Sequence, residues 1–135
     1  MSKATFWSIA TIPGIKPTEV NLLQTQGIET TQDLLSKTRN QQHQEALARE
    51  LKIEYRYLRK WIALADLARI PSVGCTYAGL LLHSGIISVS QLSQTPVNRL
   101  RQQILRMQVA TMQRKDLCPP VELVQQWLIE AKSLI

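Results

Sequence analysis

Two short segments of the chain combine residue types that can hold a phosphate group. The glycines, basic residues and threonines of these segments are Gly14, Lys16 and Thr18 in the first, and Arg69, Gly74 and Thr76 in the second. Glycine allows the backbone to approach a ligand closely, and the free amides at a helix N-terminus attract anions. We expect each threonine to be the N-cap of the helix that follows it. The chemistry predicted for both segments is therefore phosphate binding by backbone amides and a nearby cation.

No combination of side chains is typical of a catalytic or metal site. Neither His43 nor His83 has an Asp, Glu or Cys at the spacing of a metal site or a catalytic triad. Cys75 precedes a predicted helix, where a thiolate is stabilised, but a small side chain without a chemical role explains this position better. Paired carboxylates and a phosphate-binding loop of the nucleotide-binding type are also missing. The sequence predicts a non-enzymatic protein with no metal, no cofactor and no small-molecule substrate.

Charge is distributed unevenly along the chain. The 16 basic and 10 acidic residues give a net charge of +6. No Asp or Glu occurs between Leu67 and Lys115, and the six basic residues of this stretch equal the whole excess. They are Arg69, Arg99, Arg101, Arg106, Arg114 and Lys115. Such a block predicts an anionic partner, either a nucleic acid or an acidic protein surface.

Composition indicates one folded domain. A chain of 135 residues can bury a core, and a hydrophobic content of 44% is typical of globular proteins. The longest apolar stretch, around residues 78–82, is far too short to span a membrane, and no signal peptide is recognisable. With only Cys75 and Cys118 as thiols, we expect a cytoplasmic protein without a disulfide.

A repeated pattern organises the chain. Ile12-Pro13-Gly14 recurs as Ile70-Pro71-Ser72, and Gly27-Ile28 recurs as Gly85-Ile86, at a constant offset (70 − 12 = 58 and 85 − 27 = 58). Gly27-Ile28 and Gly85-Ile86 each fit the end of a helix, where glycine adopts a left-handed conformation and isoleucine folds back onto the helix. The pattern predicts an all-α, single-domain protein with two repeated units.

The predicted helices follow from caps and apolar spacing. Thr30 or Thr31, and Ser88, are expected to cap a short helix in each unit, and Asn40 to cap a helix over 41–51. Apolar residues at helical spacing predict further helices over 54–69 and 121–134. Trp61 and Trp127 correspond at an offset of 66, which predicts an insertion of eight residues near Pro119-Pro120. The units are then about 9–66 and 67–135.

The repeated unit resembles the helix-hairpin-helix motif, in which a loop with two glycines turns between two helices. Over residues 9–135 the chain is similar to a family of uncharacterised bacterial proteins, a domain of unknown function built from tandem hairpins and common in photosynthetic bacteria. The residues that carry the resemblance are Ile12-Pro13-Gly14-Ile15, Gly27-Ile28, Trp61, Ala65-Asp66-Leu67, Ile70, Gly74, Gly85-Ile86, Trp127 and Ala131. The resemblance implies phosphate contact through the loop amides. Each loop keeps one glycine of two, however, because Lys16 and Ser72 replace the others.

Two functions are consistent with these features. The first is sequence-independent binding of a nucleic-acid backbone by both loops, with Arg99, Arg101 and Arg106 extending the contact surface. The alternative is a protein-interaction adaptor or assembly factor, for instance of a photosynthetic complex, in which the hairpins are scaffolding. Phe6 and Trp7 either anchor a partner or close the core over the first loop. Because the basic excess belongs to the second unit, we expect the functional face there.

Overall fold

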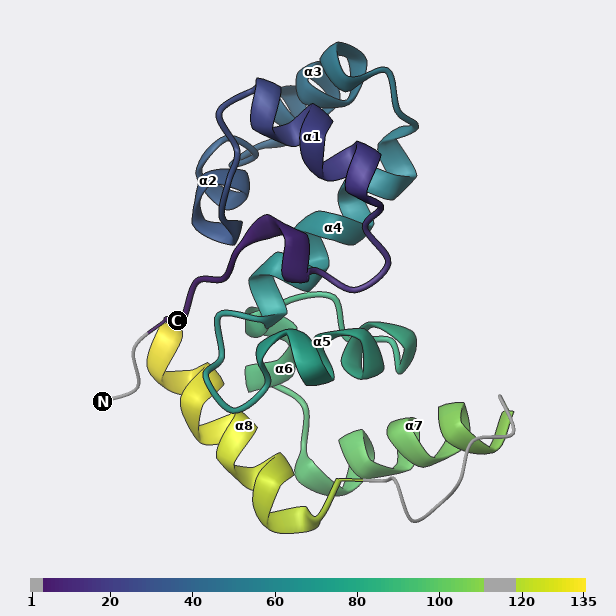
Figure 1. Cartoon of the computed structure of the whole chain (residues 1–135). Helices are drawn as coiled ribbons and strands as arrows, with labels where there is room; N and C mark the ends of the chain where they lie inside the picture. The colour runs from purple at the N-terminus through teal and green to yellow at the C-terminus, as the bar shows by residue number, and fades with distance from the viewer. Residues whose placement is uncertain (1–3, 111–118) are drawn as a thin grey trace.

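The structure, a computed structural model, describes residues 4–110 and 119–135, and within them the chain forms eight α-helices in two groups (Figure 1). The N-terminal group contains α1 (Pro17–Thr25), α2 (Thr31–Ser36), α3 (Gln41–Leu51) and α4 (Tyr55–Leu67). The C-terminal group contains α5 (Gly74–His83), α6 (Val89–Ser93), α7 (Val97–Ala110) and α8 (Val121–Leu134). A short 3-10 helix, Ile9–Thr11, precedes α1. The prediction of an all-α compact domain is confirmed.

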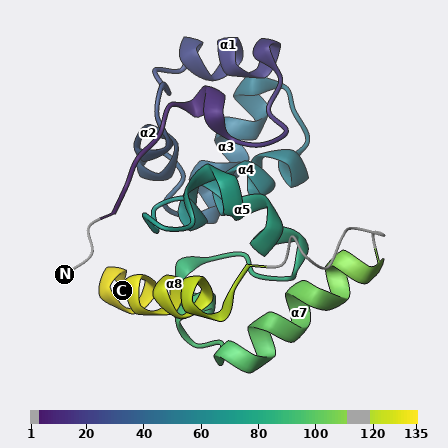
Figure 2. The ribbon, with the colours of Figure 1, turned by 60° about the horizontal axis from the view of Figure 1, so that its bottom comes forward.

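The two groups use the same pairs of helices. In the N-terminal group α4 packs against α2 and α3, and in the C-terminal group α8 packs against α6 and α7. The groups are joined by contacts between α4 and α5, which lie between α1 and α8 in both views (Figures 1 and 2). One continuous core results, with Leu58, Leu64 and Trp127 among its most buried side chains. The boundary between the units near residue 66 stays a prediction. Helix α4 extends to Leu67, so no break in the helix marks residue 66 itself.

Glycines end the first helix of each group as predicted. Gly27 and Gly85 have φ angles of +76° and +98°, in the left-handed region. The Ile28 amide donates to the Leu23 carbonyl at 3.0 Å, and the Ile86 amide donates to the Leu81 carbonyl at 2.9 Å. Both isoleucines are buried, as expected for this type of helix end.

Three predicted N-caps are also confirmed. The side chains of Thr30, Ser88 and Asn40 accept hydrogen bonds from amides in the first turns of α2, α6 and α3. The Asp33 carboxylate in turn accepts from the Thr30 amide at 3.1 Å, which completes a reciprocal cap. Helices α2, α3 and α6 therefore each begin where a side-chain oxygen accepts a hydrogen bond from a free amide of the first turn.

Thr18 and Thr76, in contrast, are not N-caps. Helix α1 begins at Pro17, whose fixed φ suits the first helical position, and Lys16 occupies the cap position. Helix α5 begins at Gly74, after a turn in which the Gly74 amide already donates to the Ile70 carbonyl at 2.9 Å. Both threonines lie one or two residues inside their helices and are exposed. The prediction was wrong because proline and a preceding turn start these helices without a side-chain oxygen.

The segment before α1 ties the two groups together. The Trp7 amide donates to the Thr31 hydroxyl at 3.0 Å, and the Thr31 amide donates to the Trp7 carbonyl at 2.8 Å. The Trp7 indole donates to the Ala68 carbonyl at 2.8 Å, and the Thr5 amide donates to the Arg69 carbonyl at 2.8 Å. Trp7 therefore closes the core where the first unit, at Thr31, meets the second, at Ala68, and not over the first hairpin alone. Phe6 remains 41% exposed.

The extra residues of the second unit fall within α7 and in the segment between α7 and α8. Helix α8 begins 66 residues after α4 (121 − 55 = 66), and α7 has 14 residues where α3 has 11. The insertion is therefore shared between a longer α7 and the connection to α8. Of that connection only Pro119 and Pro120 are described; Arg114, Lys115 and Cys118 lie outside the described residues.

Candidate functional site

The first loop, residues 12–16, has an open backbone. Gly14 has a φ of +81°, and no heavy atom lies within 4 Å of the position that a Cβ would take. Lys16 and Thr18 are exposed beside it. The Lys16 amide, however, donates to the Glu19 carboxylate at 2.8 Å. A phosphate at this loop would have to compete with that carboxylate, so the loop is accessible but only partly suited to an anion.

The second loop, residues 70–74, is filled by the chain's own side chains. The Ser72 amide and hydroxyl donate to the Glu130 carboxylate at 2.8 and 2.7 Å, and the Trp127 indole donates to the Ser72 carbonyl at 3.2 Å. Gly74 is buried under Trp7, and a Cβ at Gly74 would lie 3.1 Å from the Trp7 ring. An internal carboxylate thus occupies the loop and an indole covers the glycine, so the phosphate contact of Gly74 stays a prediction that these two contacts disfavour.

Glu130 is held as a carboxylate by these contacts. Its side chain is only 5% exposed, and burial by itself raises the pKa. Three hydrogen bonds outweigh burial and lower the pKa of Glu130 overall. They come from the hydroxyl and the backbone amide of Ser72, and from the side-chain amide of Gln126 at 2.6 Å. The second loop thus contains a permanent negative charge at neutral pH.

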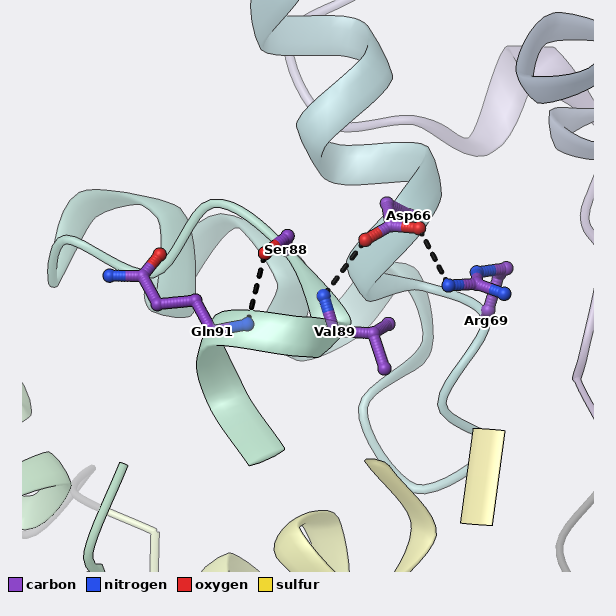
Figure 3. A network of polar contacts seen from close by, with 5 residues as sticks. All are labelled: Asp66, Arg69, Ser88, Val89 and Gln91. Carbon is purple, nitrogen blue, oxygen red and sulfur yellow. Dashed lines mark hydrogen bonds and ion pairs between the residues drawn. The ribbon is translucent and has the colours of Figure 1, made fainter. Parts of the chain in front are cut away.

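Arg69 is also committed to the fold (Figure 3). Its Nη2 lies 2.8 Å from Asp66 Oδ1, and the other carboxylate oxygen of Asp66 accepts from the Val89 amide at 2.8 Å. Both charged side chains are largely buried, with exposed fractions of 26% and 22%. This arrangement links the end of α4 to the first turn of α6, beside the Ser88 cap. The predicted phosphate contact of Arg69 would therefore compete with this internal ion pair.

The three arginines of α7 are exposed, and we call the exposed surface that carries them the α7 face. Arg99 and Arg106 lie on the same side of the helix, and Arg101 lies about 160° around it from Arg99. Arg99, Arg101 and Arg106 are exposed, while Leu100 and Ile104 of the same helix are buried in the core. Within the described part of the chain none of the three arginines forms an ion pair. Helix α7 contains no Asp or Glu. In both views α7 lies at the other end of the molecule from α1 (Figures 1 and 2). The first loop itself borders α5, because a Cβ at Gly79 would lie 4.0 Å from the Pro13 side chain.

A groove between helices of both groups is a further surface that was not predicted from the sequence. A groove of about 410 Å³ lies where α2, α4, α5 and the start of α6 meet. We call it the α4 groove; its apolar lining is Leu35, Ile62, Ala63, Leu82 and Ile87, and its basic lining is Arg56, Arg59 and Lys60. The spacing of the three basic residues on α4 was visible in the sequence, but the apolar residues come from distant positions that only the fold brings together.

Comparison with known families decides the classification. Residues 13–134 match the family described as "Domain of unknown function (DUF4332)". The chain belongs to the DUF4332 family. No curated protein and no solved structure matches it significantly.

The described residues of this DUF4332 domain contain no group of three His, Cys, Asp or Glu that could hold a metal ion. No described helix is long and apolar enough to cross a membrane. Cys75 lies half-exposed with its Sγ 3.4 Å from the Thr11 hydroxyl. Two surfaces of the described structure carry unpaired cations: the α7 face, which is otherwise polar, and the α4 groove, which is otherwise apolar.

Proposed function

We propose that this protein is a non-enzymatic binding module that contacts the backbone of nucleic acid through the α7 face. The observation that carries the proposal is that Arg99, Arg101 and Arg106 are all exposed and have no ion-pair partner among the described residues. Arginine presents a planar fork of donors that fits phosphate oxygens. Among the described residues, an anion bound at the α7 face would displace no ion pair.

The character of the α7 face favours phosphates over a protein surface. Its other exposed residues include the polar Asn98 and Gln102, and Leu105 is its large exposed apolar side chain. A stable protein interface needs a well-packed centre depleted of charge, whereas phosphate contacts need only cations and hydrogen-bond donors. Because phosphate contacts do not read the bases, we expect binding without sequence preference.

The helix-hairpin-helix character of the two groups is part of this proposal. It is supported by the repeated order of loop and helices and by a glycine at positive φ in each loop, Gly14 at +81° and Gly74 at +52°. We nevertheless assign the main phosphate contacts to α7. The reason is that Glu130 fills the second loop and Glu19 occupies an amide of the first.

Salt dependence of duplex binding tests this function. We expect fluorescence anisotropy with a labelled random duplex to give a Kd on the order of micromolar at 50 mM salt. Three phosphate contacts predict a slope of about −2.7 in a plot of log K against log salt, which is roughly 40-fold weaker binding at 200 mM. Absence of binding at 50 mM salt would refute the proposal.

Charge reversal locates the contact. We expect Arg99→Glu with Arg106→Glu to weaken duplex binding by about tenfold or more, because phosphate contacts are replaced by repulsion. The matched control is Arg49→Glu with Lys132→Glu, which changes the net charge equally at exposed positions on α3 and α8. An equal loss in both double variants would show that total charge, and not the α7 face, governs binding.

A further inference from the structure

The α4 groove combines an apolar lining with free cations. Leu35, Ile62, Ala63 and Leu82 are half-buried, and Ile87 is 55% exposed although it borders the same groove. These five side chains come from both helix groups, so the groove exists only in the assembled fold. Its volume of about 410 Å³ lies within the range of pockets that bury a ligand.

The charges of the groove are not balanced internally. Arg56, Arg59 and Lys60 are one helical turn or less apart on α4 and are all exposed. Arg56 pairs with Glu54 at 2.7 Å, whereas Arg59 and Lys60 form no ion pair with a described residue. The acidic residue of the lining, Asp66, is already bound to Arg69 and to the Val89 amide. Arg59 lies over the Tyr55 ring, with its Cζ 5.9 Å from the ring centroid. Neither Arg59 nor Lys60 is thus matched by a carboxylate within the described part of the chain, and both charges can pair with a partner.

We propose that the α4 groove docks an acidic segment of a partner protein. A bulky apolar side chain of that segment packs among Ile62, Leu82 and Ile87, and its carboxylates pair with Arg59 and Lys60. Since Arg59 and Ile62 lie three residues apart on α4, about 4.5 Å along the helix axis, a carboxylate within one helical turn of the apolar side chain fits both contacts. This surface is separate from the α7 face and does not depend on nucleic-acid binding.

The lining of the groove favours protein over single-stranded nucleic acid as its occupant. Nucleic-acid bases bind in such channels mainly by stacking on aromatic rings. No aromatic side chain is among the residues that line the α4 groove. Aliphatic side chains beside free cations are instead complementary to a segment that mixes leucine-like and acidic residues.

Peptide selection provides the test. Random 12-residue peptides displayed on phage are selected on the full-length protein, and the enriched sequences are synthesised with a fluorescent label. We expect them to contain a bulky apolar residue with Asp or Glu within four positions. Arg59→Glu with Lys60→Glu, and separately Ile87→Asp, should each weaken their binding at least tenfold. The control Arg49→Glu with Lys132→Glu should bind within about twofold of the unchanged protein.

Several results would overturn the proposal. These are the absence of enriched peptides, enriched peptides without acidic residues, equal binding by the groove variants, or displacement of the peptide by a random duplex. Circular dichroism melting of each variant verifies the fold, and Arg59→Gln with Lys60→Gln replaces the reversal if that variant melts early. Because the α7 arginines are unchanged in all groove variants, loss of peptide binding with retained duplex binding separates this surface from the proposed function.

Discussion

Replacing Trp127 by alanine is expected to lower the free energy of unfolding by about 3–5 kcal/mol. The Trp127 side chain is completely buried, and the centroid of its ring lies 5.1 Å from the centroid of the Tyr77 ring. Its indole also donates to the Ser72 carbonyl, so the substitution opens a cavity and leaves the second loop less anchored. Small domains have total stabilities of about 5–15 kcal/mol, so this substitution removes a large fraction of the total.

Urea denaturation followed by circular dichroism measures this effect. Trp127→Phe is the control, because it keeps most of the ring and loses only the indole hydrogen bond, for an expected cost of about 1–2 kcal/mol. A loss below about 1 kcal/mol for Trp127→Ala would mean that Trp127 is not packed in the core as described above.

Replacing Glu130 by alanine is expected to lower the free energy of unfolding by about 3 kcal/mol. The substitution removes hydrogen bonds at 2.8 and 2.7 Å and leaves the Ser72 amide and hydroxyl without their partner in a largely buried loop. Glu130→Gln retains the shape and one acceptor, so we expect a smaller loss. Equal stability of all three proteins in urea would show that the carboxylate does not hold the loop closed.

The same carboxylate makes stability dependent on pH. Because the pKa of Glu130 is lower in the folded than in the unfolded protein, its contribution is complete above the usual glutamate pKa of about 4.3. That contribution is lost as the pH falls through the lower folded-state value. We therefore expect acid to destabilise the unchanged protein more than Glu130→Gln. Asp33, whose pKa is also lowered by backbone amides of Glu29 and Thr30, leaves a residual acid dependence in both.

Local features of the fold could be predicted from the sequence because their causes are local. Gly27 and Gly85 end helices by adopting a conformation that other residues avoid, and Thr30 and Ser88 cap helices with oxygens three residues from the amides they satisfy. The start of α1 was predicted incorrectly because both Thr18 and Pro17 are typical of a helix N-terminus. The helix begins at Pro17, which takes the first helical position and leaves Thr18 inside the helix.

The candidate site was harder to predict because its decisive contacts are distant in sequence. Glu130 reaches Ser72 across 58 residues, and Trp7 reaches Ala68 across 61. Neither contact leaves a periodic signal, so Gly74 and its loop appeared open when they are filled. Arg69 differs, since its pairing with Asp66 at a spacing of three residues is a recognisable helix-end pattern.

Nuclear magnetic resonance mapping of the duplex contact tests the central claim that phosphates meet the α7 face and not the closed second loop. A labelled sample of the full-length protein is titrated with a random 12-base-pair duplex at 50 mM salt. We predict that amide shift changes concentrate in residues 97–108 and leave residues 70–74 unchanged. Shift changes centred on the second loop would contradict the account, because they would require Glu130 to give up the Ser72 amide to a phosphate.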